Sequence, residues 1–127
     1  MKIRRPVSEV FNAMVDPKIT TNFWFTKSSG IMVAGGHVQW DWEMYKVSAV
    51  VNVKEILENE KITFEWGDKD KRLVEFTFTP LLDDSTYFTA KESGYVETGA
   101  ELLEIIKDST GGFTTLLDGC KAYLEHG

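Results

Sequence analysis

The middle of the chain alternates between apolar and polar residues with a period of two, as half-buried β-strands do. The alternation is clearest in residues 37–44 and continues through residues 47–53. Three later segments repeat it, at residues 62–66, 74–78 and 86–90, and short polar turns separate them. Because short turns join consecutive strands, this pattern predicts a meander of antiparallel strands.

The alternation changes parity near Lys54, because Glu55 and Ile56 do not fit the preceding pattern. A β-bulge at this position would explain the change, and bulges bend sheets. We therefore expect a curved sheet with one aromatic face. The aromatic residues with the parity of this inner face are Trp40, Trp42, Phe64, Trp66, Phe76, Phe78 and Phe88.

Helical spacing appears at both ends of the chain. Pro6 can occupy the first turn of a short helix that contains Val10 and Met14, and Asp16 followed by Pro17 predicts the start of a second short helix. After Thr98 the apolar residues recur at helical spacing, which predicts a long C-terminal helix. Its apolar stripe is Leu102, Leu103, Ile106, Phe113, Leu116, Leu117, Cys120 and Leu124.

Two adjacent glycines, Gly111 and Gly112, interrupt this helical pattern. Each glycine costs about 1 kcal/mol relative to alanine in a helix interior, yet the apolar stripe resumes in register, so we expect a kinked helix. Ser109, Thr110 and Gly112 are small where the stripe should contact the sheet. The sequence therefore predicts an α+β fold in which a curved antiparallel sheet and a long C-terminal helix enclose a hydrophobic cavity.

Composition limits the function classes. The 127 residues fit one domain, residues 1–127, and the net charge of −6 disfavours binding to nucleic acid or to anionic membranes. No segment approaches the roughly twenty apolar residues of a membrane span. The single cysteine, Cys120, cannot form an internal disulfide and has apolar neighbours, so we expect a buried thiol and a cytoplasmic protein.

The sequence contains no motif for catalysis or for a cofactor. It has no nucleophile elbow, phosphate-binding glycine loop or dinucleotide fingerprint. His37 and His126 lack partners at metal-ligand spacing, and the acidic residues around Asp68 and Asp83 fit hairpin turns. We therefore expect no catalytic residue, no metal and no cofactor, and the patterns favour a protein that is not an enzyme.

Two features leave alternatives open. Glu92 shares parity with Phe88 and Ala90, so a regular strand points its carboxylate inward, where it could anchor a ligand, whereas a frayed strand leaves it in water. The aromatic knot around Trp24 either plugs one end of the cavity or forms an exposed patch for a partner. Tyr95, just after a glycine, is the tyrosine best placed to offer a hydroxyl group to a ligand.

Four segments, in their order and spacing, resemble homologues of the activator of the 90-kDa heat-shock protein ATPase. The segments are residues 5–13 (RPVSEVFNA) with Asp16-Pro17, the turn Gly35-Gly36, residues 53–56 (VKEI), and residues 111–124 (GGFTTLLDGCKAYL). The resemblance implies the START-like helix-grip fold, which this family shares with polyketide cyclases, lipid-transfer domains and plant pollen allergens.

Together these observations predict noncatalytic binding of a hydrophobic small molecule between the sheet and the C-terminal helix. The family name implies an alternative, a stress-related protein that binds a chaperone or client through its surface, and a cyclase or hydrolase is a further alternative. A short first strand, residues 1–5, would leave a sheet edge incompletely covered and predicts a homodimer. The expected cavity residues are Trp40, Trp42, Phe64, Trp66, Phe76, Phe78, Phe88, Glu92, Tyr95, Ile106, Gly112, Phe113 and Leu116.

Overall fold

The computed structural model describes residues 1–66, 71–94 and 99–127, with the backbone alone for Tyr45 and residues 99–111. Within these residues, the strands form one antiparallel sheet in the order β1-β7-β6-β5-β4-β3-β2. In chain order the elements are β1 (Lys2–Ile3), α1 (Val7–Val15), α2 (Pro17–Thr20), β2 (Lys27–Ser28), β3 (His37–Trp42), the 3-10 helix η1 (Glu43–Tyr45), β4 (Val47–Leu57), β5 (Lys61–Trp66), β6 (Arg72–Pro80), β7 (Thr86–Ser93) and α3 (Gly99–His126).

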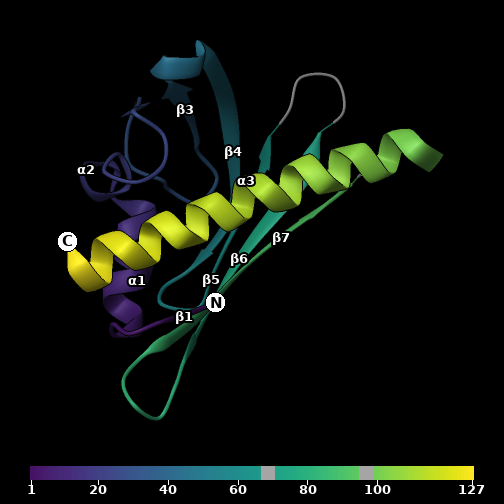
Figure 1. Cartoon of the computed structure of the whole chain (residues 1–127). Coiled ribbons are helices and arrows are strands. Elements are labelled where there is room, and N and C mark those ends of the chain that lie inside the picture. The colour runs from purple at the N-terminus through teal and green to yellow at the C-terminus, as the bar shows by residue number, and fades with distance from the viewer. Residues whose placement is uncertain (67–70, 95–98) are drawn as a thin grey trace.

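Figure 1 shows the long helix α3 crossing the sheet. The two short helices, α1 and α2, lie near the C-terminal end of α3. The predicted α+β architecture is thereby confirmed. The bulge is confirmed as well, since the pairing of β4 with β5 shifts by one residue between Val53 and Glu55. Beyond the shift, Ile56 lies opposite Ile62, so the inner face of the sheet stays apolar along the whole of β4.

The short helices begin where the sequence signals predict. Asp16 is the N-cap of α2, and its carboxylate accepts a hydrogen bond from the backbone N–H of Lys18 at 3.0 Å. Pro6 lies one position earlier than we expected, at the N-cap of α1, where its carbonyl accepts from the N–H groups of Glu9 and Val10. Helix α1 then packs its apolar face against β6 and β7.

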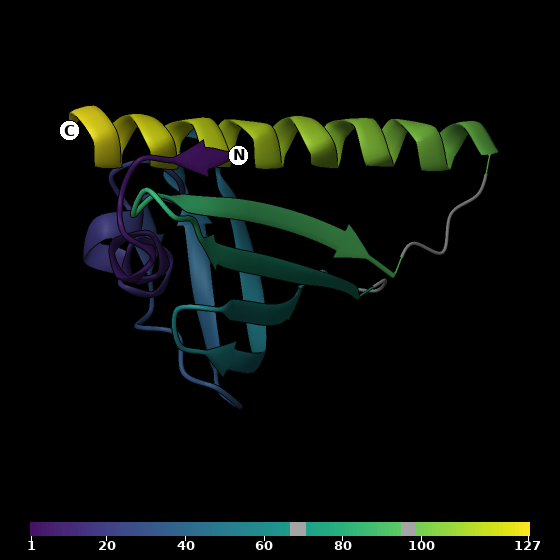
Figure 2. The same cartoon turned by 90° about the horizontal axis from the view of Figure 1, so that it is seen from below.

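Helix α3 is continuous through both glycines, and Figure 2 shows it as a straight rod above the sheet. The predicted kink is therefore wrong. Gly112 is exposed, and a Cβ placed on it would meet no heavy atom within 4 Å, so packing at Gly112 does not force the helix to bend. Gly119 has a different role, because a Cβ there would lie 3.0 Å from the carbonyl oxygen of Phe23. The missing side chain lets α3 approach the segment that follows α2.

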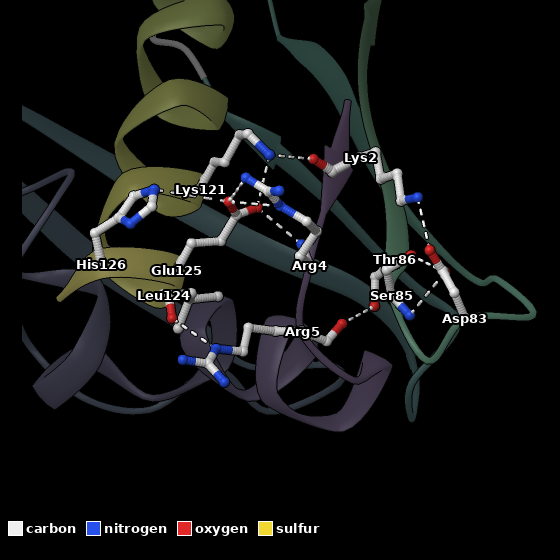
Figure 3. Close-up of polar contacts among 10 residues, drawn as sticks. All are labelled: Lys2, Arg4, Arg5, Asp83, Ser85, Thr86, Lys121, Leu124, Glu125 and His126. Carbon is white, nitrogen blue, oxygen red and sulfur yellow. Dashed lines mark hydrogen bonds and ion pairs between the residues drawn. The ribbon is translucent and has the colours of Figure 1, made fainter.

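The C-terminal half of α3 is fastened to the N-terminus by a polar latch, which we define as Arg4, Arg5, Lys121, Leu124 and Glu125 (Figure 3). The Glu125 carboxylate accepts from the Arg4 backbone N–H at 2.8 Å, from Arg4 Nη2 at 3.1 Å and from Lys121 Nζ at 2.6 Å. Arg5 Nε donates to the carbonyl of Leu124 at 2.7 Å and so caps the end of the helix.

The Glu125 side chain is only 4% exposed, and its hydrogen bonds from Lys121 and Arg4 lower its pKa from 4.5 to about 2. Nearby, hydrogen bonds from Lys2 and Ser85 likewise lower the pKa of Asp83 to about 2. Both carboxylates therefore favour the folded state in their ionised form.

Strand β1 covers little of the sheet edge. It pairs with Tyr87 and Thr86 of β7, and the Met1 amino group and carbonyl exchange 2.9 Å hydrogen bonds with Phe88. Within the described residues, no strand continues this pairing along Ala90–Ser93. A short, partly uncovered edge is thus present, as the sequence predicts.

We predict that replacing Glu125 with Gln weakens the acid sensitivity of the fold. The folded-state pKa of Glu125 lies below its ordinary value, so its contribution to stability is present above about pH 4.5 and is lost as the pH falls towards about 2. Denaturant unfolding followed between pH 7 and pH 2.5 should show a shallower pH dependence in Glu125→Gln than in the wild type. Asp83 retains part of the slope in both proteins.

Glu58→Gln is the control, because Glu58 is exposed in the turn that follows β4. This variant should keep the wild-type pH dependence. A Glu125→Gln variant whose unfolding free energy falls as steeply with acid as that of the wild type would contradict the role assigned to the latch.

Candidate functional site

The inner face of the sheet is a closed aromatic core in its central part. Phe64, Phe76 and Phe88 are fully buried, and successive rings among them meet edge to face at 5.3 Å and 5.5 Å. Phe78 stacks on Phe88 at 4.8 Å, and Trp40 stacks on Phe25 at 4.6 Å. Full burial of each such side chain contributes roughly 1.5–3 kcal/mol, so these rings chiefly stabilise the fold.

Trp24 lies inside the curve of the sheet. Its ring lies 5.0 Å from that of Trp40, 5.7 Å from Trp42 and 6.1 Å from Phe76. Of the two orientations that the sequence left open for this aromatic knot, the structure has the inward one. Trp24 thus fills the concave side of the sheet between β3 and β6, and it lines the site although the sequence did not predict it as a cavity residue.

The aromatic face continues beyond this core to an open end, which we define as the half-buried residues Trp42, Trp66, Ala90, Glu92 and Phe113. Phe113 of α3 stacks on Trp66 at 6.1 Å with an interplanar angle of 25°. Strand registers place Ala90 opposite Phe76 and Glu92 opposite Val74, so both face the same side as the buried rings. The open end is therefore apolar surface that the protein covers only in part.

Glu92 points inward at this open end. The Trp66 indole N–H donates a hydrogen bond to its carboxylate, with Nε1 2.8 Å from Oε2. The strand is regular here, since β7 pairs with β6 as far as Ser93. The inward alternative for Glu92 is therefore the one that the structure shows, and an acceptor group lies among aromatic rings.

Arg72 is a neighbour that sequence reasoning missed. It lies opposite Trp66 at the start of β6 and shares the parity of Val74 and Phe76, so it belongs to the inner face. Its side chain is half-buried. The signal was present in the alternation itself, because extending the apolar positions of β6 back by two residues reaches Arg72.

The remaining expected residues divide into three groups. Leu116 is fully buried and belongs to the core, next to Cys120, whose thiol pKa burial raises to about 12. Gly112 is exposed beside Phe113, with open space where a side chain would be. Tyr95 lies outside the described residues, and so does the side chain of Ile106.

Two surface clefts occur in the described part of the chain. One, of about 380 Å³, lies between the C-terminal turn of α3 and Phe23, and the other, of about 390 Å³, lies beside η1 and includes Trp42 and Lys46. In the latter, hydrogen bonds from Gln39 and Ser48 lower the pKa of Asp41. This carboxylate is thereby held in a surface network, away from the Trp66–Glu92 pair.

Metal and membrane features are both lacking in the described part of the chain. Residues 1–66, 71–94 and 99–127 contain no described group of three or more His, Cys, Asp or Glu side chains arranged to hold a metal ion. No helix in the same ranges is both long enough and apolar enough to cross a membrane.

Three solved structures show how this architecture relates to known proteins. Protein SSP2350 from Staphylococcus saprophyticus has 25% identity and a TM-score of 0.82, covering 100% of this chain and 90% of that one. The Aha1 dimer from Colwellia psychrerythraea has 14% identity and a TM-score of 0.82, with 100% and 93% covered. DynU16, from the dynemicin biosynthetic locus, has 22% identity and a TM-score of 0.86, with 100% of this chain but 46% of that one covered.

These likenesses confirm the START-like helix-grip fold. No curated protein matches the chain significantly. The family model described as "Activator of Hsp90 ATPase homolog 1-like protein" matches residues 4–125, nearly the whole chain. The chain therefore belongs to the family of activator of Hsp90 ATPase homolog 1-like proteins.

Proposed function

We propose that this protein binds a hydrophobic small molecule at the open end of its aromatic face, beneath α3. The observation that carries the proposal is the half-burial of Trp42, Trp66 and Phe113 on the side of the sheet that faces the helix. An apolar guest that covered these rings would remove their remaining surface from water. This burial would stabilise the complex by about 25 cal/mol for each Å² of apolar surface. Ligand sites of this kind are concave and mostly apolar, with few polar groups.

The likeness to DynU16 supports a small-molecule role. That protein comes from a locus for the biosynthesis of dynemicin, and it shares the fold of this chain. The described inner face offers one carboxylate, Glu92, and one guanidinium, Arg72, among apolar side chains. This composition suits binding better than the cyclase or hydrolase alternative, which needs a larger polar cluster inside the site.

We predict saturable binding of a neutral apolar dye such as Nile red, measured by dye fluorescence and by tryptophan quenching. Replacing Ala90 with Leu should lower the affinity about tenfold or more, because three added carbon atoms occupy the open end and displace the guest. Loss of the contact made by one buried methylene group lowers the binding free energy by roughly 1 kcal/mol, and steric overlap of the new side chain with the guest lowers it further.

Thr89→Leu is the matched control, since Thr89 points to the opposite face of the same strand. It should bind the dye as the wild type does. If dyes, fatty acids and flavonoids all fail to give a saturable signal with the wild-type protein, the proposed function is wrong.

The family description supports a second candidate, contact with the 90-kDa heat-shock protein. We predict that, if this candidate is correct, the protein retains the chaperone of its own organism in a pull-down and raises the ATPase rate of that chaperone. Ala90→Leu should leave both effects intact, because they depend on exterior surface. If the protein neither retains the chaperone nor raises its ATPase rate, this second candidate function is wrong. That result would not contradict the proposed binding of a small molecule.

The uncovered part of β7 supports self-association, and Aha1 from Colwellia psychrerythraea, which shares the fold, is a dimer. Phe88 directs its N–H and C=O towards Met1, so Ala90, two residues further along β7, directs its own N–H and C=O to the same edge.

We predict that light scattering detects a dimer at high protein concentration. Ala90→Pro, which removes one edge-facing N–H and spares the bonds to β6, should shift the protein to monomer. A wild-type protein that stays monomeric throughout the concentration range would exclude the edge contact.

A further inference from the structure

An exposed apolar group lies at the end of the hairpin formed by β3 and β4. The two strands pair as far as Trp42 and Val47, and η1 connects them at the top of the view in Figure 1. Met44 of η1 is 62% exposed and Val47 is 52% exposed, while Trp42 is half-buried. We define Trp42, Met44, Lys46 and Val47 as the hairpin tip.

The hairpin tip extends past its neighbouring strands. The register of β4 with the described part of β5 begins at Asn52. Val47, five residues earlier, lies about 16 Å along the strand from that pair, at the usual rise per residue. On the other side of the hairpin, β2 pairs with β3 only at Trp40 and Asp41. Since Met44 and Val47 are also more than half exposed, the tip is a projection from the molecule.

Charged groups of both signs surround the tip. The cleft of about 390 Å³ beside η1 is lined by Lys27, Asp41, Trp42, Glu43, Lys46, Val47 and Ser48. Its lysines and carboxylates balance in formal charge, although the whole chain carries −6. Hydrogen bonds from Gln39 and Ser48 lower the pKa of Asp41 and keep its carboxylate ionised. In the part of the chain that the structure describes, neither lysine of the cleft belongs to a salt bridge.

This combination of groups complements the surface of a bilayer made of zwitterionic lipids. A phosphocholine headgroup carries one phosphate and one quaternary ammonium, so it offers a partner to the lysines and another to the carboxylates. The face of an indole such as that of Trp42 also attracts a quaternary ammonium. Apolar side chains beside these groups can enter the boundary between headgroups and acyl chains and leave water.

A protein partner fits the tip less well than a lipid surface does. Specific protein interfaces bury about 800 Å² on each partner, which takes roughly 20–30 residues. The apolar side chains of the tip, Trp42, Met44 and Val47, lie at the end of one hairpin and are too few for such an interface. A fluid lipid surface, in contrast, closes around a small projection.

We propose that the hairpin tip docks the protein reversibly on zwitterionic lipid bilayers. Met44 and Val47 insert at the headgroup level, and the lysines and carboxylates of the cleft contact the phosphate and ammonium groups. The inference goes beyond the proposed function, because it assigns a surface that binding of a small molecule does not require. The net charge of −6 makes a strongly anionic bilayer the poorer partner.

The test is co-sedimentation with vesicles of phosphatidylcholine, and separately with vesicles of phosphatidylglycerol. The wild-type protein should partition onto phosphatidylcholine and bind phosphatidylglycerol more weakly. The double variant Met44→Ser/Val47→Ser should lower the partition coefficient on phosphatidylcholine about tenfold or more, because it removes most of the apolar surface that inserts.

Ile31→Ser/Val33→Ser is the matched control. These two side chains are 55% and 59% exposed, and they lie in the loop before β3, at the opposite end of that strand from the tip. This variant should partition onto phosphatidylcholine as the wild type does. An equal loss of binding in this variant and in Met44→Ser/Val47→Ser would overturn the role of the tip.

A labelled protein decides the question if the double variant does not fold. Cys120 is fully buried, and burial raises the pKa of its thiol to about 12, so a thiol-reactive dye labels an introduced surface cysteine selectively. An environment-sensitive dye on Met44→Cys should brighten when phosphatidylcholine vesicles are added, whereas the same dye on Ile31→Cys should not.

Three results would overturn the proposal: no partitioning of the wild type onto phosphatidylcholine, tighter binding to phosphatidylglycerol, or no response of the dye at residue 44. None of them would contradict the proposed binding of a small molecule, because that binding is measured without lipid.

Discussion

The concave face of the sheet carries more aromatic surface than the helices bury, and this imbalance shapes the rest of the molecule. Helix α1 and the C-terminal half of α3 close one part of the face, where Phe64, Phe76 and Phe88 are fully buried. Further along β5, Trp66 remains half-buried, and so does Trp42 at the end of β3. A protein core normally excludes such surface from water, so we place the proposed ligand on the part of the face that stays uncovered.

The position of α3 follows from where it is fastened. Its described side chains hold it through Leu116 and Cys120 in the core and through Glu125 in the polar latch, and all three belong to its C-terminal half. The N-terminal residues Arg4 and Arg5 supply the other side of the latch. Phe113 is the last of these contacts towards the open end, where it stacks on Trp66. The same helix therefore closes the core and borders the proposed site.

Family membership and function are separate conclusions here. The family match and the structural likenesses define the fold, and a single fold can host many unrelated functions. The features behind the proposed function are local: a carboxylate held by an indole at the end of an aromatic face, with a guanidinium in the next row. The proposed ligand site depends on these residues and on the surface around them.

The sequence by itself determined the longer strands, the helices α1, α2 and α3, and the faces of the sheet, but not β2 or η1. Alternation along the strands identified the inner aromatic residues, the change of parity located the bulge near Lys54, and capping residues such as Asp16 marked the start of α2. These features are local, because strand period, helix spacing and cap chemistry depend on residues only a few positions apart. The family resemblance added the arrangement of sheet and helix.

Only the tertiary structure decided which distant groups meet. Glu125 and Arg4 are 121 residues apart in the chain, and Trp66 and Glu92 are 26 apart, so no local pattern pairs them. The straight course of α3 was also decided at this level, since the helix keeps its direction through Gly112, where an added Cβ would meet open space. Hydrogen-bond partners and the burial of a carboxylate depend on strand register and helix position, which are properties of the whole packed chain.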